Sequence, residues 1–279
     1  MTIASIRQSR LSQMSAQPVL EPPVATHVDA VSVGVRMYAA SAIVLGLVGL
    51  VWGDFAAVWQ PVPTGLPART ALAYLTALVF VASGAGLLWR RSARVSACVL
   101  AALYFLFAIL WLPRVAAYPR ALGVWNGVFE QLALVAAAVT YFAAASAPND
   151  TTRRWQWMMR LLFGVCLLSF GATHFAALKE TAALVPPWLP PSPRFWAAAT
   201  GVLHLAAGLA ILSDRKAVLA SRLFTAMLIG FGILVWAPRL IANIHVHQVW
   251  AGNAVNFTLI GAAWLMADAI ADSVRSSPR

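Results

Sequence analysis

The sequence predicts an all-α, polytopic membrane protein whose eight transmembrane helices form two tandem four-helix repeats of the same orientation. Three observations support this prediction. Hydrophobic residues make up 61% of the chain and charged residues only 10%, whereas soluble domains carry roughly 25% charged residues. The mean hydropathy is +0.76, and eight apolar stretches follow one another along the chain. The second half of the chain also repeats the first, which is the signature of a repeat architecture.

A membrane-spanning helix needs about 20 apolar residues, with a range of about 17 to 25. The apolar stretches of the first repeat lie at residues 37–53, 70–89, 95–112 and 121–147, and those of the second repeat at 161–178, 195–213, 223–238 and 249–267. Around them we expect a disordered cytoplasmic tail at 1–34, the first repeat at 35–147, a cytoplasmic linker at 148–157, the second repeat at 158–270 and a cytoplasmic tail at 271–279.

The repeat is clearest around a W-x-P-R motif. Residues 109–125 read ILWLPRVAAYPRALGVW, and residues 234–250 read LVWAPRLIANIHVHQVW. Matches at a spacing of 125 residues are Trp111/Trp236, Pro113/Pro238, Arg114/Arg239, Ala117/Ala242, Trp125/Trp250, Gly127/Gly252 and Leu134/Leu259. Earlier in each copy the spacing is 124 residues, at Thr76/Thr200, Ala82/Ala206, Gly84/Gly208 and Leu88/Leu212.

The basic residues predict the orientation. With the N-terminus in the cytoplasm, 14 of the 20 lysines and arginines fall on the cytoplasmic side, as the positive-inside rule requires. Both termini are then cytoplasmic, and four spans per copy give the copies the same orientation, related by an axis along the membrane normal. Small residues at Gly49-x-x-x-Gly53 and along 206–210 are expected to pack the copies together. The partner is the lipid bilayer and not nucleic acid, because the basic residues form no stripe.

Three polar side chains are predicted to lie near the middle of the bilayer. Glu130, His204 and Asn256 each stand nine residues inside a helix, or about 13 Å at 1.5 Å per residue. His204 occupies the place of Phe80 in the other copy, and Asn256 that of Gln131. We therefore predict a proton-handling or quinone-headgroup site in which His204 and Glu130 act as donor and acceptor. Hydrogen bonding between helices is the alternative.

Asp54 and His174 stand at matching places, each followed by Phe-Ala, where the first helix of each copy reaches the outer surface. Both are catalytic candidates. Proline-rich loops follow at 61–67 and 186–191, and we expect each to fold over the outer mouth of its copy. Trp188 in the second loop is a candidate ligand-binding residue. Helical rise places His174 and His204 roughly 9 Å apart along the membrane normal, which argues against haem held by both.

Further ligand-binding candidates are Arg114, Arg239, Gln131, Asn253 and Asn256. The two arginines suit an anionic group, or their side chains extend to the membrane surface. His245 and His247 form an H-x-H pair for a metal ion near His174, or else interfacial histidines. Cys98 and Cys166 lie on different helices with no C-x-x-C pair, which excludes thiol–disulfide catalysis.

Three segments carry a family resemblance. They are Thr-His-Phe at 173–175, VPPWLPP at 185–191 and TGVLHLAAGLAIL at 200–212. They resemble the DoxX family of small bacterial four-helix membrane proteins. The first copy resembles it through GDFA and ASGAGLL, so the likeness extends over residues 36–270. Where that family has an acidic residue in its second helix, this chain has His204.

The resemblance implies a bacterial inner-membrane protein of quinone-linked sulfur oxidation, as in thiosulfate:quinone oxidoreductase, or of redox protection. Quinone is then the candidate cofactor, and redox proteins are the candidate partners. A small-molecule carrier and a structural membrane scaffold without catalysis are the alternatives, so the sequence leaves open whether the protein is an enzyme. No nucleotide loop, dinucleotide fingerprint or H-E-x-x-H helix is present, so electrons would come from a partner or a lipid-soluble carrier.

Overall fold

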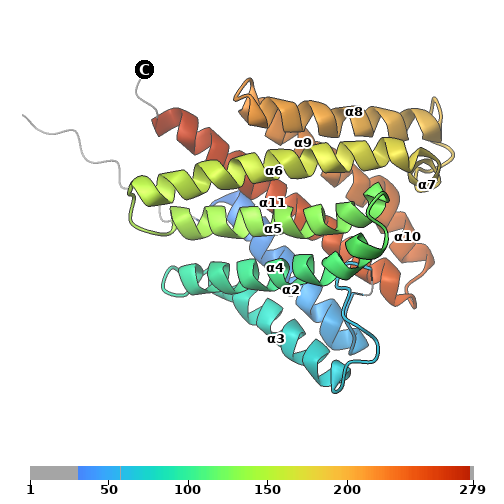
Figure 1. Cartoon of the computed structure of the whole chain (residues 1–279), viewed down its shortest axis with the longest axis horizontal. Helices are drawn as coiled ribbons and strands as arrows, with labels where there is room; N and C mark the ends of the chain where they lie inside the picture. Colours follow the sequence, from blue (N-terminus) through green and yellow to red (C-terminus); the bar gives the residue numbers. More distant parts are fainter. Residues whose placement is uncertain (1–30, 57, 277–279) are drawn as a thin grey trace, which may run out of the picture. The chain divides into compact units, whose positions relative to one another are not determined.

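The computed structural model describes residues 31–56 and 58–276, which form helices joined by loops, with no strand among them. The first half holds α2 (Val33–Trp52), α3 (Arg69–Leu87), α4 (Ala93–Ala117) and α5 (Leu122–Ala144) (Figure 1). The second holds α6 (Asp150–Ala176), the short α7 (Leu178–Ala182), α8 (Pro193–Leu212), α9 (Ala217–Phe231), the π-helix η1 (Gly232–Trp236), α10 (Ala237–Ala242) and α11 (His247–Ser276). By length and composition, the described residues provide eight spans, with α9, η1 and α10 forming one of them. At the level of helix number, length and composition, the prediction of an all-α, multi-pass membrane protein is confirmed.

Helix caps, and not the apolar runs, set where two of the helices begin. α2 already begins at Val33, where the Ser32 side chain accepts a hydrogen bond from a backbone N–H of the first turn. α6 begins at Asp150, behind a capping box formed by Asn149 and Thr152. Most of the segment predicted as a linker is therefore the exposed, polar start of a helix.

The predicted C-terminal tail at 271–279 is helical as far as Ser276, the last residue of α11. Residues 277–279 and the tail predicted at 1–30 lie outside the part of the chain that the structure describes.

The long helices form a closed circuit of neighbours. In the order α2, α3, α4, α5, α6, α8, α9 and α11, each helix packs against the next, and α11 packs back on α2. α5 also packs against α11. The two halves of the chain therefore meet along three helix pairs, α5 with α6, α2 with α11, and α5 with α11.

The predicted role of two small-residue motifs is wrong, because these motifs pack helices within one half. A Cβ atom built on Gly49 would lie 3.0 Å from the Ala77 Cβ of α3, and one on Gly208 would lie 2.8 Å from a carbonyl oxygen of α6. Gly53 ends α2 with a positive φ of 61°. Between the halves a different glycine matters, since a Cβ on Gly261 would lie 2.6 Å from the Tyr38 Cα. Close helix contact of this kind needs a residue without a side chain.

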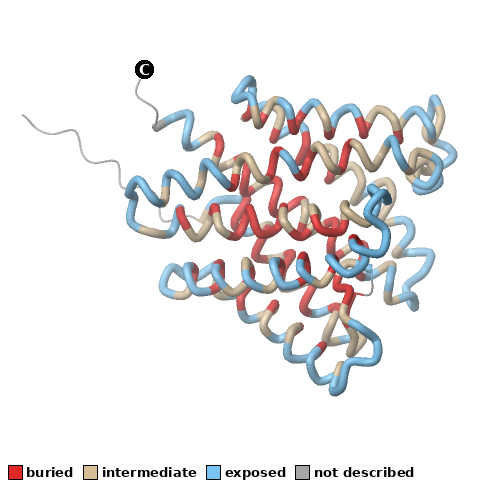
Figure 2. Tube along the Cα trace, viewed as in Figure 1, coloured by how far each residue is buried: buried red, intermediate tan, exposed pale blue. Residues whose placement is uncertain are grey.

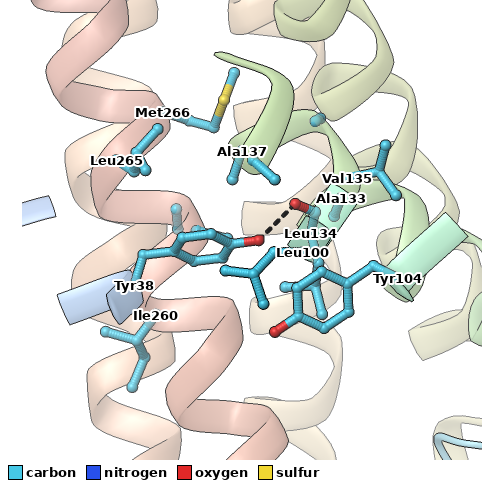
Figure 3. Packing of buried hydrophobic residues seen from close by; sticks show 14 of the residues in the cluster. Tyr38, Leu100, Tyr104, Ala133, Leu134, Val135, Ala137, Ile260, Leu265 and Met266 are labelled. Carbon is cyan, nitrogen blue, oxygen red and sulfur yellow. Dashed lines mark hydrogen bonds between the residues drawn. The ribbon is translucent and has the colours of Figure 1, made fainter. Parts of the chain in front are cut away.

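Buried residues concentrate along the middle of the helices, and the ends are exposed (Figure 2). Tyr38 of α2 is fully buried, and its hydroxyl donates to the Leu134 carbonyl of α5 at 2.8 Å. Figure 3 shows this bond among side chains from α2, α4, α5 and α11. Large apolar side chains also stand on the outside, for example Val51 and Ile241, each 79% exposed. An apolar exterior of this kind is compatible with contact to lipid.

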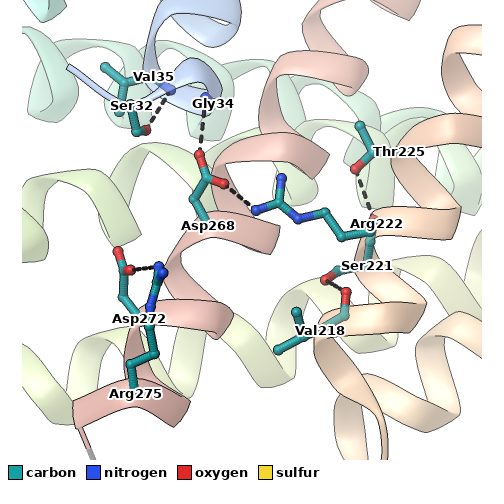
Figure 4. Close-up of polar contacts among 10 residues, drawn as sticks. All are labelled: Ser32, Gly34, Val35, Val218, Ser221, Arg222, Thr225, Asp268, Asp272 and Arg275. Atoms are coloured by element: carbon teal, nitrogen blue, oxygen red, sulfur yellow. Dashed lines mark hydrogen bonds and ion pairs between the residues drawn. The ribbon is translucent and has the colours of Figure 1, made fainter. Parts of the chain in front are cut away.

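A polar tie joins the three helices α2, α9 and α11 (Figure 4). The Asp268 carboxylate of α11 accepts from the Gly34 backbone N–H of α2 at 3.1 Å and from the Arg222 guanidinium of α9 at 2.7 Å. A second tie joins α6 to the end of α8, where the Arg160 guanidinium donates to the Ile211 carbonyl and to Asp214. These ties satisfy backbone groups at helix ends that would otherwise lack partners.

The two W-x-P-R motifs lie in helices of different geometry. α4 continues past Pro113 to Ala117, so this proline does not end its helix. In the second half a π-helix precedes Pro238, which stands in the first turn of α10. A π-helix takes up one extra residue. That extra residue accounts for the change in spacing, because η1 begins after Leu212, matched at 124 residues, and ends at Trp236, matched at 125.

Candidate functional site

A cavity of about 310 Å³ lies between α5, α6, α8, α11 and the π-helical span. Apolar and aromatic side chains form most of its wall. Four candidates from the sequence, Glu130, His174, His204 and Asn256, line it together. These side chains come from four different helices, so the cavity exists only when both halves of the chain pack together.

The two cavity histidines contact each other directly. The ring centroids of His174 on α6 and His204 on α8 lie 4.5 Å apart with an interplanar angle of 38°. The predicted separation of roughly 9 Å is therefore wrong. The reason is the register of the two helices: a Cβ on Gly201 would lie 3.0 Å from the His174 Cβ, and α8 begins at Pro193, eight residues earlier. Haem held by both rings is still excluded, because rings in contact leave no space for a macrocycle between them.

Backbone hydrogen bonds orient both imidazole rings. Nδ1 of His204 lies 2.7 Å from the Thr200 carbonyl oxygen, and Nδ1 of His174 lies 2.9 Å from the Phe170 carbonyl oxygen. A carbonyl oxygen only accepts, so Nδ1 of each ring carries the hydrogen. In the neutral ring Nε2 then holds a lone pair.

Aromatic rings surround His204, which is 2% exposed. The rings of Phe170, Phe224 and Phe231 have centroids within 5.3 to 6.3 Å of its own. The matching residue in the first half, Phe80, stacks on Phe107 at 6.3 Å. The same position is thus an apolar core contact in one half and a polar group in the other.

The carboxyl group of Glu130 has two partners in the cavity wall. The Asn126 Nδ2 group donates to Glu130 Oε1 at 2.9 Å, and the Trp59 side chain also hydrogen-bonds this carboxyl group. The Asn126 Oδ1 atom is buried and has no hydrogen-bond partner. Asn256 Nδ2 donates to the Leu228 carbonyl over a long 3.5 Å.

The proline-rich segment after α7 covers one side of the cavity. Leu184, Val185, Pro186 and Leu189 line it, and the Trp196 indole N–H donates to the Pro190 carbonyl at 2.8 Å. Trp188 is 67% exposed and is not among the lining residues. Trp59 stands just before the proline-rich loop of the first half, at residues 61–67. Trp59 also lines the cavity, whereas residues 61–67 do not.

Asp54 stands apart from this cavity. Its carboxylate pairs with the Arg69 guanidinium and accepts from the Phe55 backbone N–H at 2.7 Å, just after the end of α2. The structure therefore separates Asp54 from the four cavity candidates.

The predicted metal pair also lies elsewhere. The His247 ring stacks on Trp52 at 5.0 Å, while His174 lies against His204, so the expected proximity of His174 to the H-x-H pair is wrong. His245 is exposed. Among the described residues no group of three or more His, Cys, Asp or Glu side chains could hold a metal ion. A two-histidine metal site stays a prediction.

The remaining ligand-binding candidates lie outside the cavity lining, and two of them hold residues of its wall. The Gln131 side chain donates to the Trp59 carbonyl at 2.9 Å, and that of Asn253 to the Trp236 carbonyl at 3.1 Å. The Arg114 guanidinium lies 5.0 Å from the centre of the Trp111 ring. Arg239 is exposed. Gln131 and Asn253 therefore hold the backbone of two tryptophans that line the cavity.

Sequence reasoning missed Asn126 and Trp59, which both interact with Glu130. Asn126 stands one helical turn before Glu130, and this spacing places both on one helix face, so it could have been found. Trp59 lies in an irregular loop, and no periodicity places a residue there.

A protein-family model described as a domain of unknown function (DUF8561) matches residues 163–266. The matched segment includes His174, His204 and Asn256 but not Glu130. No curated protein and no solved structure matches the chain. The DoxX resemblance therefore stays a prediction from the three motif segments.

Proposed function

We propose that this chain is a bacterial inner-membrane protein that binds a quinone-class ring compound in the cavity, as the quinone-interacting component of a membrane redox system. One observation carries the proposal: two imidazole rings and a carboxyl group from three helices meet in one largely apolar, aromatic cavity.

The size and wall of the cavity suit a single flat ring. Its volume of about 310 Å³ falls at the lower end of small-molecule sites, which span about 300 to 1,000 Å³ with few polar groups. Phe231 and Trp236 provide aromatic faces, while Glu130, His174 and His204 provide polar groups. A quinone combines matching features, an apolar ring and oxygen atoms on opposite edges of that ring. The sequence carries no flavin or nucleotide motif, so the electrons would pass to a redox partner protein.

The proposal includes the arrangement of two tandem repeats with the same orientation and both termini in the cytoplasm. The neighbours of equivalent helices support it. α2 packs on α3 as α6 packs on α8, and α5 packs on α6 as α11 packs on α2. α5 and α11, the last spans of the two halves, pack on each other, as helices beside a twofold axis would.

The proposal is tested by purifying the full chain in mild detergent and analysing its organic extract by mass spectrometry. Calorimetric titration with a 1,4-benzoquinone carrying a decyl chain follows, in both the oxidised and the reduced form. We expect co-purified quinone and saturable binding of at least one form. If neither form binds and none co-purifies, the proposal is wrong, and uptake into proteoliposomes tests the carrier alternative.

Two substitutions on α8 serve as the matched pair for this experiment. His204→Phe places the residue of the first half in the cavity wall. Leu203→Phe adds a ring at the neighbouring position, where Leu203 is 47% exposed and does not line the cavity. Binding that is weakened in His204→Phe and unchanged in Leu203→Phe assigns the ligand to this cavity.

A further inference from the structure

We propose that the cavity selects the reduced, hydroxyl-bearing form of its ligand, a quinol, over the oxidised quinone. This inference rests on the proposed function and adds to it which redox form is held and by which atoms. It follows from the direction of the hydrogen bonds in the cavity wall.

The histidine pair offers acceptors. Each Nδ1–H is already donated to a backbone carbonyl, at 2.7 Å for His204 and 2.9 Å for His174. Each neutral ring has one hydrogen only, so Nε2 presents a lone pair and no hydrogen. Two acceptor nitrogens therefore stand within one pair of touching rings.

Other polar groups of the wall also present acceptor atoms. Asn126 donates one of its two Nδ2 hydrogens to Glu130, and its buried Oδ1 is left without a partner. The Thr200 hydroxyl donates to the Trp196 carbonyl at 2.8 Å, so its oxygen presents lone pairs only. The Glu130 carboxyl group receives hydrogen bonds from both Asn126 and Trp59. Asn126 and Asn256 each keep a second Nδ2 hydrogen, whereas the two histidine Nε2 atoms, the Thr200 hydroxyl and the Asn126 Oδ1 atom form a set of acceptors.

A quinone and its quinol differ in whether their oxygen atoms donate hydrogen bonds, which is the property that the polar groups of this wall distinguish. The carbonyl oxygens of a quinone only accept, whereas each hydroxyl of a quinol donates one hydrogen. An acceptor facing an acceptor leaves both buried groups unpaired, which weakens binding. A site built to bond a hydroxyl group discriminates strongly against an analogue that lacks it. The acceptor set is therefore complementary to the quinol.

The test compares three ligands on the full chain in detergent, without oxygen and at pH 8, where an ordinary imidazole with a pKa of about 6.5 is neutral. The probes are the decyl benzoquinone, its quinol and the dimethyl ether of that quinol. The ether keeps the ring and tail but has no hydrogen to donate. We expect the quinol to bind at least about tenfold more tightly than either of the others, because donors are then matched to acceptors.

The variants assign the preference to the histidines. We expect His204→Phe to lower the ratio of quinol to quinone affinity by about tenfold, and Leu203→Phe to leave that ratio unchanged. If His204→Phe fails to fold, the comparison of the three ligands on the natural chain still decides the question, because it needs no substitution.

The outcomes separate this inference from the proposed function. Equal binding of quinone and quinol, or tighter binding of the quinone, overturns the selection of the reduced form and leaves the quinone site in place. Equal binding of the quinol and its ether also overturns it. If no ring compound binds at all, the proposed function fails, and this inference fails with it.

Discussion

At the scale of single residues, one position separates a packed core from a polar cavity. Phe80 and His204 stand at matching places and lie beside phenylalanine rings with equal centroid distances of 6.3 Å, to Phe107 and Phe231. Phe80 is 1% exposed, between Tyr104 and Phe107. Only the histidine has a polar edge that needs a partner.

Reciprocal substitutions at this position are expected to have opposite effects on stability. Phe80→His places an imidazole in an apolar wall, and an unpaired buried polar group costs about 1 to 3 kcal/mol. His204→Phe removes such a group and adds an apolar ring, so it should leave the thermal midpoint unchanged or raise it. Thermal denaturation in detergent, followed by tryptophan fluorescence, measures both. A large loss of stability in His204→Phe would indicate that His204 holds the fold.

At the scale of helices, close contact between the halves depends on glycine. We expect Gly261→Ala to destabilise the protein by about 1 to 3 kcal/mol, because its Cβ would lie 2.6 Å from the Tyr38 Cα. Gly123→Ala on α5 is the control, since a Cβ there meets nothing within 4 Å, and it should stabilise slightly. Thermal midpoints compare the two. Equal thermal midpoints would mean that α2 and α11 can move apart without loss of stability.

The π-helix η1 is the second helix-scale feature with a testable consequence. It contributes Leu234, Val235 and Trp236 to the cavity wall. Deletion of Ile233, which is 64% exposed, should restore a continuous α-helix and move these three residues out of the cavity wall. We expect ligand affinity to fall by at least about tenfold while the protein stays folded, because π-helices commonly shape functional sites.

Ile233→Ala is the control for this deletion, because it keeps the residue count and therefore the π-helix. Calorimetric titration of both variants is the measurement. Unchanged affinity after the deletion would show that the wall does not depend on the extra residue.

Helix positions and the grouping of three polar residues could be predicted from the sequence, whereas helix register and loop contacts could not. Apolar length located the eight spans, and helical rise grouped Glu130, His204 and Asn256, which line one cavity. The contact of His174 with His204 was missed because glycine packing sets how far α8 extends beyond α6. Trp59 was missed because a loop conformation has no period. The one-residue shift between the copies was visible in the sequence, but its meaning as a π-helix was not.

At the scale of the whole molecule, the bundle joins the two halves by polar ties as well as by packing. Asp268 connects α2, α9 and α11 through Gly34 and Arg222. Arg222 is one of the 14 basic residues that fall on the cytoplasmic side when the N-terminus is cytoplasmic. If that assignment holds, the tie at Asp268 lies at the cytoplasmic end, and the proline-rich segment beside the cavity lies at the outer end.

The orientation itself can be tested by labelling with a membrane-impermeant maleimide after Cys98 and Cys166, the two native cysteines, are replaced. Gly65→Cys lies in the connection between α2 and α3, and Ala147→Cys lies between α5 and α6, both at exposed positions. Three helices separate these connections, so they lie on opposite sides of the membrane. Because 14 of the 20 basic residues then fall inside, we expect Gly65→Cys to react in intact cells and Ala147→Cys only after permeabilisation. The reverse labelling pattern would show that the protein has the opposite orientation in the membrane. Labelling of both cysteine variants in intact cells would contradict the number of spans between the two connections.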